Sequence, residues 1–208
     1  MSSGTLTLRQ TWLAQGRANV PADVIEAGLW DELAEEAERL EPLAVVRHNQ
    51  RPGLLAMRDG SITSPQRCTV HPGSGALLAL AQSKALAEVA AEATGAQSMT
   101  AIRFGFKYYQ PSDYMHVHRD DGKCSITFSA ALTPGLGAMG WLPRLRWLTT
   151  EEVVERLGDT PYPDGEAFPV QYRALTGFDG ARIPHWRAPL DSHSREVLVT
   201  VCFTDLSM

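Results

Sequence analysis

The spacing of hydrophobic positions changes along the chain. In residues 21–40 apolar side chains recur every three to four positions opposite an acidic face, which predicts an amphipathic helix. A second helical period covers residues 74–95, an alanine-rich stretch that ends at Gly95, a residue type that often closes helices. After Gly95 the period becomes two. The pattern therefore predicts a helical first part followed by a β-rich part.

Residues 99–109 illustrate the two-residue period. Phe106 and Tyr108 fall on one face of the predicted strand, and Lys107 and Tyr109 fall on the other. Three more segments have similar patterns: residues 124–132, 168–178 and 195–206. Turn residues rather than crossover helices separate these segments, which favours an antiparallel sandwich or barrel.

The region between Trp141 and Gly165 interrupts the β pattern. Thr149 and Glu152 have the spacing of a capping box, and Gly158 follows as a stop signal, so one short helix is expected there. The remainder of this region is predicted to be a long excursion from the β core. Long excursions of this kind are often functional.

Composition narrows the class of protein. A chain of 208 residues suits one domain. With 44% apolar residues and a formal net charge of −5, the chain lacks the basic surface that binding to nucleic acid or an anionic membrane requires. No stretch approaches the ~18 apolar residues of a membrane span, and the first residues lack the apolar centre of a signal peptide. We expect a cytoplasmic protein without nucleic-acid or membrane partners.

The three cysteines are Cys68, Cys124 and Cys202. They are widely spaced, odd in number and lack a C-x-x-C pair, so the sequence indicates neither a disulfide framework nor a zinc knuckle. Reduced, mostly buried thiols are the expectation.

Candidate metal ligands cluster in the sequence HVHRDD. In an extended segment His116, His118 and Asp120 share one side, so either histidine or both could bind a metal with Asp120. His185 follows a glycine-containing turn, and Arg195 opens a β-like run ten residues later. Two histidines and one carboxylate make the facial triad that leaves open positions on ferrous iron.

These motifs resemble the Fe(II)/2-oxoglutarate-dependent oxygenase superfamily, nearest its prolyl-4-hydroxylase-like branch. That branch has a tyrosine-led segment, a proline-containing turn and then H-x-D, and Tyr109, the sequence QPSD and the HRD of residues 118–120 stand in that order. The second half of the family pattern is a distal histidine, a proline four residues on and a basic residue about ten on. His185, Pro189 and Arg195 match those spacings.

The resemblance covers residues 99–205 and implies a fold. It is a mainly β structure with flanking helices, a double-stranded β-helix or jelly roll whose N-terminal helices pack on the larger sheet. Residues 1–208 would form a single domain, with residues 1–98 as a helical part carrying the first strands and residues 99–208 as the metal-binding core.

The resemblance also implies roles for single residues. It assigns the iron to His118, Asp120 and His185. Arg195 would bind the distal carboxylate of 2-oxoglutarate, with Tyr109 as a hydrogen-bond donor and the Thr127 hydroxyl as a second. Tyr108 takes the place of Tyr109 if the register differs by one. Four residues are substrate-binding candidates: His116, Arg103, Arg187 and Trp141.

The implied activity is oxidation, by default hydroxylation, of an unactivated C–H bond. Fe(II), 2-oxoglutarate and dioxygen would be required, and ascorbate is expected to stimulate turnover. A small molecule such as an amino acid or natural-product intermediate is favoured over a protein side chain. Two alternatives remain: a cupin-like dioxygenase or isomerase that uses His116, His118 and His185 without 2-oxoglutarate, and a non-catalytic jelly roll that binds a ligand.

Overall fold

The computed structural model describes residues 6–49, 56–58, 61–63, 65–134, 138–168 and 170–206. The helices in these ranges are α1 Leu8–Gln15, α2 Ala27–Leu40, α3 Gly75–Ala81, α4 Lys84–Thr94 and α5 Thr150–Leu157, with 3₁₀ turns η1 Ala22–Val24, η2 Glu41–Leu43 and η3 Pro143–Leu145. The first strands are β1 Arg17–Asn19, β2 Val45–Asn49, β3 Ala56–Arg58, β4 Ser61–Thr63, β5 Gln66–His71 and β6 Met99–Tyr109. The later strands are β7 Tyr114–His118, β8 Ile126–Ala131, β9 Met139–Trp141, β10 Glu166–Phe168, β11 Thr176–Phe178, β12 His185–Arg187 and β13 Glu196–Asp205.

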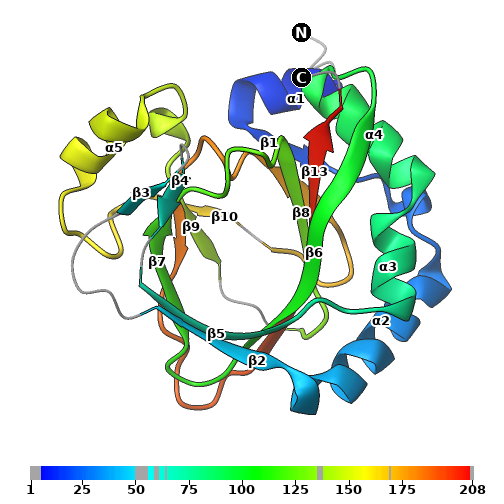
Figure 1. Ribbon diagram of the computed structural model, residues 1–208. Coiled ribbons are helices and arrows are strands. Elements are labelled where there is room, and N and C mark those ends of the chain that lie inside the picture. The colour runs from blue at the N-terminus through cyan, green and yellow to red at the C-terminus, as the bar shows by residue number, and fades with distance from the viewer. Residues whose placement is uncertain are drawn as a thin grey trace, which may run out of the picture.

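Eleven of the described strands form one curled antiparallel sheet (Figure 1). Its order is β1-β11-β8-β13-β6-β5-β7-β12-β9-β10, with β2 paired to β5. The long strand β6 pairs with β13 over almost its whole length. Strand β5 pairs with β6 through its last residues and with β7 through its first, so it joins the two halves of the curl. This is a double-stranded β-helix, which confirms the predicted fold class.

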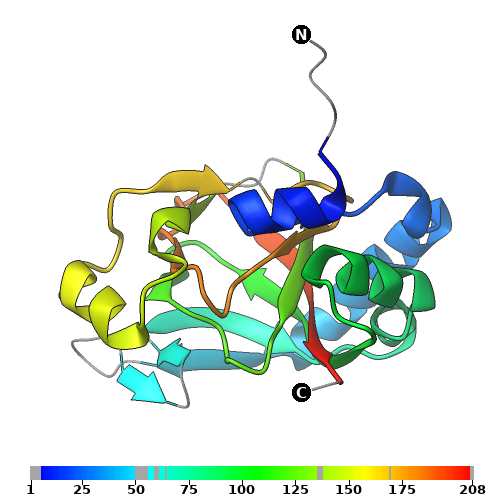
Figure 2. The same ribbon diagram turned by 90° about the horizontal axis from the view of Figure 1, so that it is seen from above.

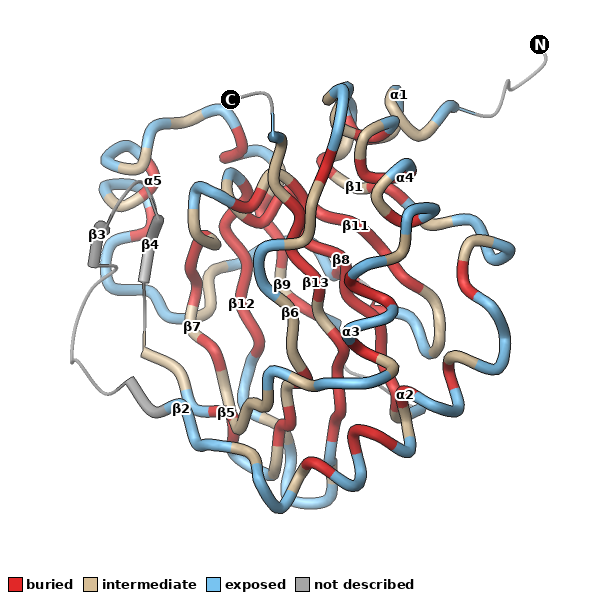
Figure 3. Tube along the Cα trace, turned by 45° about the vertical axis from the view of Figure 1, so that its right-hand side comes forward, coloured by how far each residue is buried: buried red, intermediate tan, exposed pale blue. Residues whose placement is uncertain are grey.

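The N-terminal helices α1 to α4 lie along one side of the curl, and α5 lies on the opposite side (Figures 1 and 2). A hydrophobic core fills the space between α1–α4 and the strands, and Leu33, Leu80, Phe106 and Val199 are fully buried in it. The Tyr108 hydroxyl donates to the carbonyl of Ala37 in α2. Burial is concentrated on the strands, while the helices keep exposed outer faces (Figure 3). One face of β6 therefore packs against the helices.

Glu36 connects α2 to α3 from a buried position. Its carboxylate accepts hydrogen bonds from the backbone N–H of Ser74 and Leu77 and from the Ser74 hydroxyl. Burial acts to raise the pKa of Glu36, but these donors hold the pKa below its ordinary value. Because the N–H groups in the first turn of a helix lack intrahelical partners, Glu36 serves as the missing cap of α3.

The predicted elements agree with the structure in type more often than in length. The helix expected over residues 21–40 begins only at Ala27, after a 3₁₀ turn. The one expected over residues 74–95 is two helices, because Ser83 breaks the run and caps α4 through its hydroxyl. The capping box at Thr149 is present in α5. The strand predicted over residues 168–178 is wrong for its middle, where only the ends at β10 and β11 are extended.

The prediction of reduced thiols is wrong for two of the three cysteines. Cys124 and Cys202 form a disulfide across a sequence separation of 78 residues, whereas Cys68 is free and buried. Sequence spacing concealed this pair, because the loop after β7 folds back against β13. None of the helices in the described part of the chain has the length and apolar content to span a membrane.

Candidate metal centre

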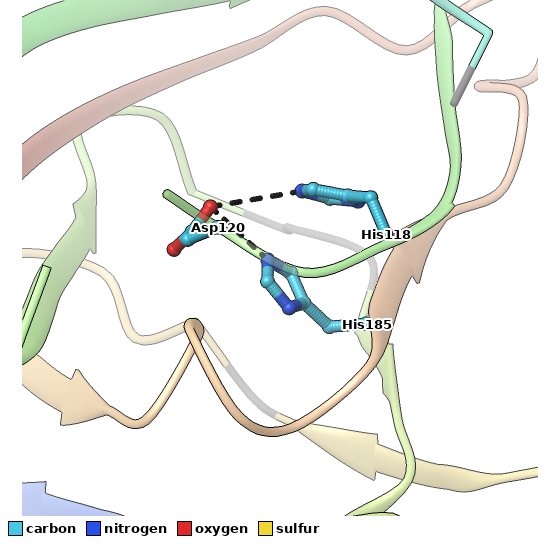
Figure 4. Close-up of side chains that lie close together, drawn as sticks. All are labelled: His118, Asp120 and His185. Atoms are coloured by element: carbon cyan, nitrogen blue, oxygen red, sulfur yellow. Dashed lines mark ion pairs between the residues drawn. The ribbon is translucent and has the colours of Figure 1, made fainter. Parts of the chain in front are cut away.

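Three side chains predicted as ligands meet at the junction of β7 and β12. His118 ends β7, Asp120 follows two residues later, and His185 opens β12 directly opposite His118 in the strand register. The Oδ1 atom of Asp120 lies 3.8 Å from His118 Nε2 and 3.7 Å from His185 Nε2 (Figure 4). The three ligand atoms lie within 4.8 Å of one another, and this is the one such group among the described residues.

Both histidine rings are held in the orientation that metal binding requires. His118 Nδ1 lies 3.0 Å from the carbonyl oxygen of His116, and His185 Nδ1 lies 2.9 Å from that of Ile183. A carbonyl can only accept, so each Nδ1 carries the proton and each Nε2 presents its lone pair toward Asp120. Ligating histidines commonly donate their second ring nitrogen in this way.

The charge states suit a cation. Burial, with His185 as a second cause, lowers the pKa of His118 to about 3, and burial also lowers the pKa of His185, so both rings are neutral at pH 7. Burial alone would raise the pKa of Asp120, but the nearby His185, His118 and Lys107 hold that pKa below its ordinary value. Two neutral imidazoles and one carboxylate therefore face a common point, a ligand set that fits Fe(II).

His116 does not join this group. Residues His116 and Val117 together oppose a single residue of β12, because the register shifts between His185 and Arg187. Such a bulge breaks the simple alternation of faces. The His116 ring lies against the rings of Tyr114 and Tyr162, at centroid distances of 4.8 and 5.0 Å. The prediction that His116 shares the side of His118 is corrected, and the three-histidine alternative loses one ligand.

The triad opens into a cavity of about 430 Å³ inside the curl. Cationic side chains from β2 and β6 line part of it, namely Arg47, Arg103 and Lys107. Apolar side chains from β9, β11 and the segment before β11 line another part, namely Met139, Val170 and Phe178. The cavity thus combines a cationic wall with an apolar one.

Two polar groups in this cavity lack partners. The Tyr109 hydroxyl is fully buried beside the Cys68 thiol and makes no hydrogen bond to a nitrogen or oxygen of a described residue, and burial raises its pKa, so it remains a donor. The Lys107 side chain makes no ion pair or hydrogen bond with any other described residue, yet it lines the same cavity as the triad. An unpartnered buried donor and a lysine beside it fit an anionic ligand. Lys107 shares the face of Tyr109 in the predicted strand but was not among the predicted site residues.

Arg195 lies elsewhere. Its guanidinium pairs with Glu41, and the side chain is 40% exposed outside the cavity. The face of β13 that carries Val197 and Val199 packs on the helices, so Arg195 points away from the triad. Glu196 occupies the inward register instead. This placement corrects the prediction that Arg195 reaches the cosubstrate.

Arg187 and Glu196 form a buried ion pair at the level of Tyr109. The Arg187 guanidinium carbon lies 5.1 Å from the centroid of the Tyr109 ring. Arg187 lines the cavity, as predicted, but its charge is offset by Glu196. Lys107 is therefore a better countercharge than Arg187 for a carboxylate ligand.

The remaining predicted residues are divided between cavity and core. Thr127 lines the cavity, but its hydroxyl donates to Asp120 Oδ2 at 3.1 Å. Arg103 lines the cavity and pairs with Asp121 at 3.0 Å. Trp141 is not part of the lining. It packs behind His185 with a ring-centroid distance of 6.1 Å, so its prediction as a substrate-facing residue is corrected.

No protein-family model matches the sequence, and a search of curated proteins found no match either. Solved structures do match. SnoN, a non-heme alpha ketoglutarate dependent epimerase from nogalamycin biosynthesis, superposes with a TM-score of 0.70 at 16% identity, covering 95% of this chain and 82% of that chain. A Pseudomonas putida prolyl-4-hydroxylase gives a TM-score of 0.59 at 15% identity, with 95% and 96% covered.

HygX from Streptomyces hygroscopicus, solved with nickel, 2-oxoglutarate and hygromycin B, gives a TM-score of 0.61 at 10% identity, with 94% of this chain and 85% of that chain covered. At these identities the likeness establishes the fold. The predicted resemblance to the Fe(II)/2-oxoglutarate oxygenases is confirmed at that level.

Proposed function

We propose that the chain is an Fe(II)/2-oxoglutarate-dependent oxygenase that hydroxylates a small molecule, with residues 1–208 acting as one domain. Dioxygen would be the oxidant, and ascorbate would stimulate turnover. The observation that carries this proposal is the pair of Nε2 atoms of His118 and His185 facing Asp120 Oδ1 inside a cavity that also holds two donors without side-chain hydrogen bonds or ion pairs to the described part of the chain. SnoN and HygX have structures with a metal and the 2-oxo acid, which supports the same chemistry here.

When bound, iron and 2-oxoglutarate would supply the oxidation of an unactivated C–H bond, with succinate as the co-product. The chain's own residues do the positioning. His118 and His185 present neutral Nε2 atoms, and Asp120 supplies one negative charge, so the triad holds a divalent ion and leaves open positions. The apolar lining around Met139 and Phe178 limits water near those positions.

We assign the distal carboxylate of 2-oxoglutarate to Lys107 and Tyr109 in place of Arg195. The lysine provides the countercharge and the phenol a hydrogen bond, and both lie on the inward face of β6. Arg187 is a weaker candidate because Glu196 offsets its charge. The same two roles were predicted for Arg195 and Tyr109, so only the cation changes.

The substrate proposed is a small molecule. A cavity of about 430 Å³ lies within the usual range for small-molecule sites. SnoN and HygX have been solved with nogalamycin RO and hygromycin B, whereas a Trichoplax adhaerens prolyl hydroxylase was solved with a peptide. A cavity of this size favours the first kind of ligand.

Succinate formation tests the proposal. Wild-type protein with Fe(II), ascorbate and 2-oxoglutarate should release succinate slowly even without the prime substrate, and His185→Ala should release none. The matched control is His116→Ala, which removes a histidine from the same region but not from the triad. Succinate at equal rates from wild type and His185→Ala, or from neither, would contradict the proposal.

A further inference from the structure

Thr127 lies beside the metal triad without belonging to it. It sits on β8, is buried, and its hydroxyl lies 3.1 Å from Asp120 Oδ2. A carboxylate oxygen accepts, so the hydroxyl is the donor and its single proton points at Asp120. That proton is then not available to a cosubstrate.

The two oxygens of Asp120 have different surroundings. Oδ1 faces the Nε2 atoms of both histidines, and Oδ2 is turned to Thr127. Gly180 closes the other side of Oδ2, because a Cβ atom at position 180 would overlap that oxygen. The backbone is fixed as well, since Asp120 N–H donates to the Gly180 carbonyl at 2.9 Å.

We infer that Thr127 is a positioning residue that holds Asp120 Oδ2 away from the metal, so that Asp120 binds through Oδ1 alone. A carboxylate bound through both oxygens would fill one more coordination position, and that position is needed for the cosubstrate or dioxygen. Gly180 supports the same arrangement, because only a residue without a side chain leaves room for Oδ2 there. The inference rests on the proposed function, since it concerns the same metal site.

Cobalt(II) is a suitable probe, because its visible absorption reports coordination number and needs no turnover. Thr127→Val removes the donor and keeps the shape, while Thr127→Ser keeps the donor. Ser129→Ala is the matched control, since Ser129 lies on the same strand and loses a buried hydrogen bond to the Val199 carbonyl rather than to Asp120. Circular dichroism identifies any variant that fails to fold.

The expected result is a 10- to 100-fold loss of Co(II) affinity in Thr127→Val, roughly the effect of removing an outer-shell partner, with an altered cobalt spectrum. Thr127→Ser and Ser129→Ala should retain wild-type affinity and spectrum. Wild-type behaviour of Thr127→Val would overturn the inference. So would a Thr127→Ser variant as impaired as Thr127→Val, because the hydroxyl would then not be the cause. If Thr127→Val does not fold, the Thr127→Ser and Gly180→Ala variants are used to test the inference. A Gly180→Ala variant with wild-type cobalt binding would then overturn it.

Failure of the proposed function gives a different pattern. Cobalt would then bind to wild type and respond to the Thr127 variants, but 2-oxoglutarate would leave the cobalt spectrum unchanged. A wild-type chain that binds no cobalt would overturn both.

Discussion

Lys107→Met should selectively destroy recognition of the distal carboxylate of 2-oxoglutarate. The change keeps the length of the side chain. Of the two cations that β6 contributes to the cavity, Arg103 pairs with Asp121, whereas Lys107 has no ion pair with a described residue. At ~4 Å and an effective dielectric constant of ~20, an ammonium–carboxylate pair has a Coulomb energy of about 4 kcal/mol. Lys107 is half-buried, so desolvation and screening reduce the net effect to about 2–3 kcal/mol.

That energy corresponds to a rise of about 30- to 140-fold in the dissociation constant, taking roughly 1.4 kcal/mol for each factor of ten. The assay is an anaerobic titration of the Fe(II) protein with 2-oxoglutarate and with 2-oxopentanoate, which has a methyl group in place of the distal carboxylate. Wild type should prefer 2-oxoglutarate by at least this factor, and Lys107→Met should lose most of that preference and keep only the part that the Tyr109 hydroxyl contributes.

Arg195→Met is the matched control for this prediction. The change removes the cation that the family pattern assigns to 2-oxoglutarate. In the structure the Arg195 guanidinium pairs with Glu41 outside the cavity. The preference for 2-oxoglutarate should therefore remain. The reasoning would be refuted if Arg195→Met lost the preference while Lys107→Met kept it.

Three further predictions follow from the same structure. His116→Gln should change Fe(II) affinity by less than about threefold, measured by competition with a chelator, and a larger loss would restore the three-histidine alternative. Replacing Cys124 and Cys202 by serine should cost about 2–4 kcal/mol, a fall in Tm of roughly 4–16 °C by calorimetry, and a reductant should lower the wild-type Tm alone. Glu36→Gln should cost about 2 kcal/mol at pH 7 in urea unfolding. Because the folded pKa of Glu36 lies below its ordinary 4.5, this cost should disappear as the pH falls through the folded value, and a cost that does not change with pH would contradict the assignment.

The sequence predicted the clustering of His118, Asp120 and His185 better than it predicted the walls of the cavity. The spacing of H-x-D left His116 and His118 open, and the family resemblance with its distal histidine selected the three residues that lie together. The alternation of faces was reliable over residues 103–109 of β6, which pair regularly, and Lys107 and Tyr109 share the inward face there. These positions depend on local periodicity, which can be read directly from the chain.

The alternation of side-chain faces gave a wrong prediction in two situations. One is an irregular strand pairing, and the other is a strand whose cavity-facing side was chosen wrongly. The bulge in β7 turned His116 outward, although simple alternation placed it with the ligands. On β13 alternation held, but the apolar face of Val197 packs on helices rather than on the cavity, so Arg195 was assigned to the wrong side. The choice of face depends on contacts with distant helices, and no local pattern contains that information.

The distant contacts of the loop after Asp120 were also beyond the sequence. The disulfide from Cys124 to Cys202 and the hydrogen bond from Thr127 to Asp120 both depend on how this loop folds back onto β8 and β13. Spacing therefore indicated free thiols, and the family resemblance indicated a cosubstrate donor at Thr127.

The most direct test of the central claim is an anaerobic titration of the Fe(II)-loaded protein with 2-oxoglutarate, followed by visible absorption. We expect a saturable absorption band with one ligand per chain, and no band in His118→Ala or without iron. Iron bound by the wild type with no absorption change on addition of 2-oxoglutarate would contradict the claim that the triad leaves positions for this cosubstrate.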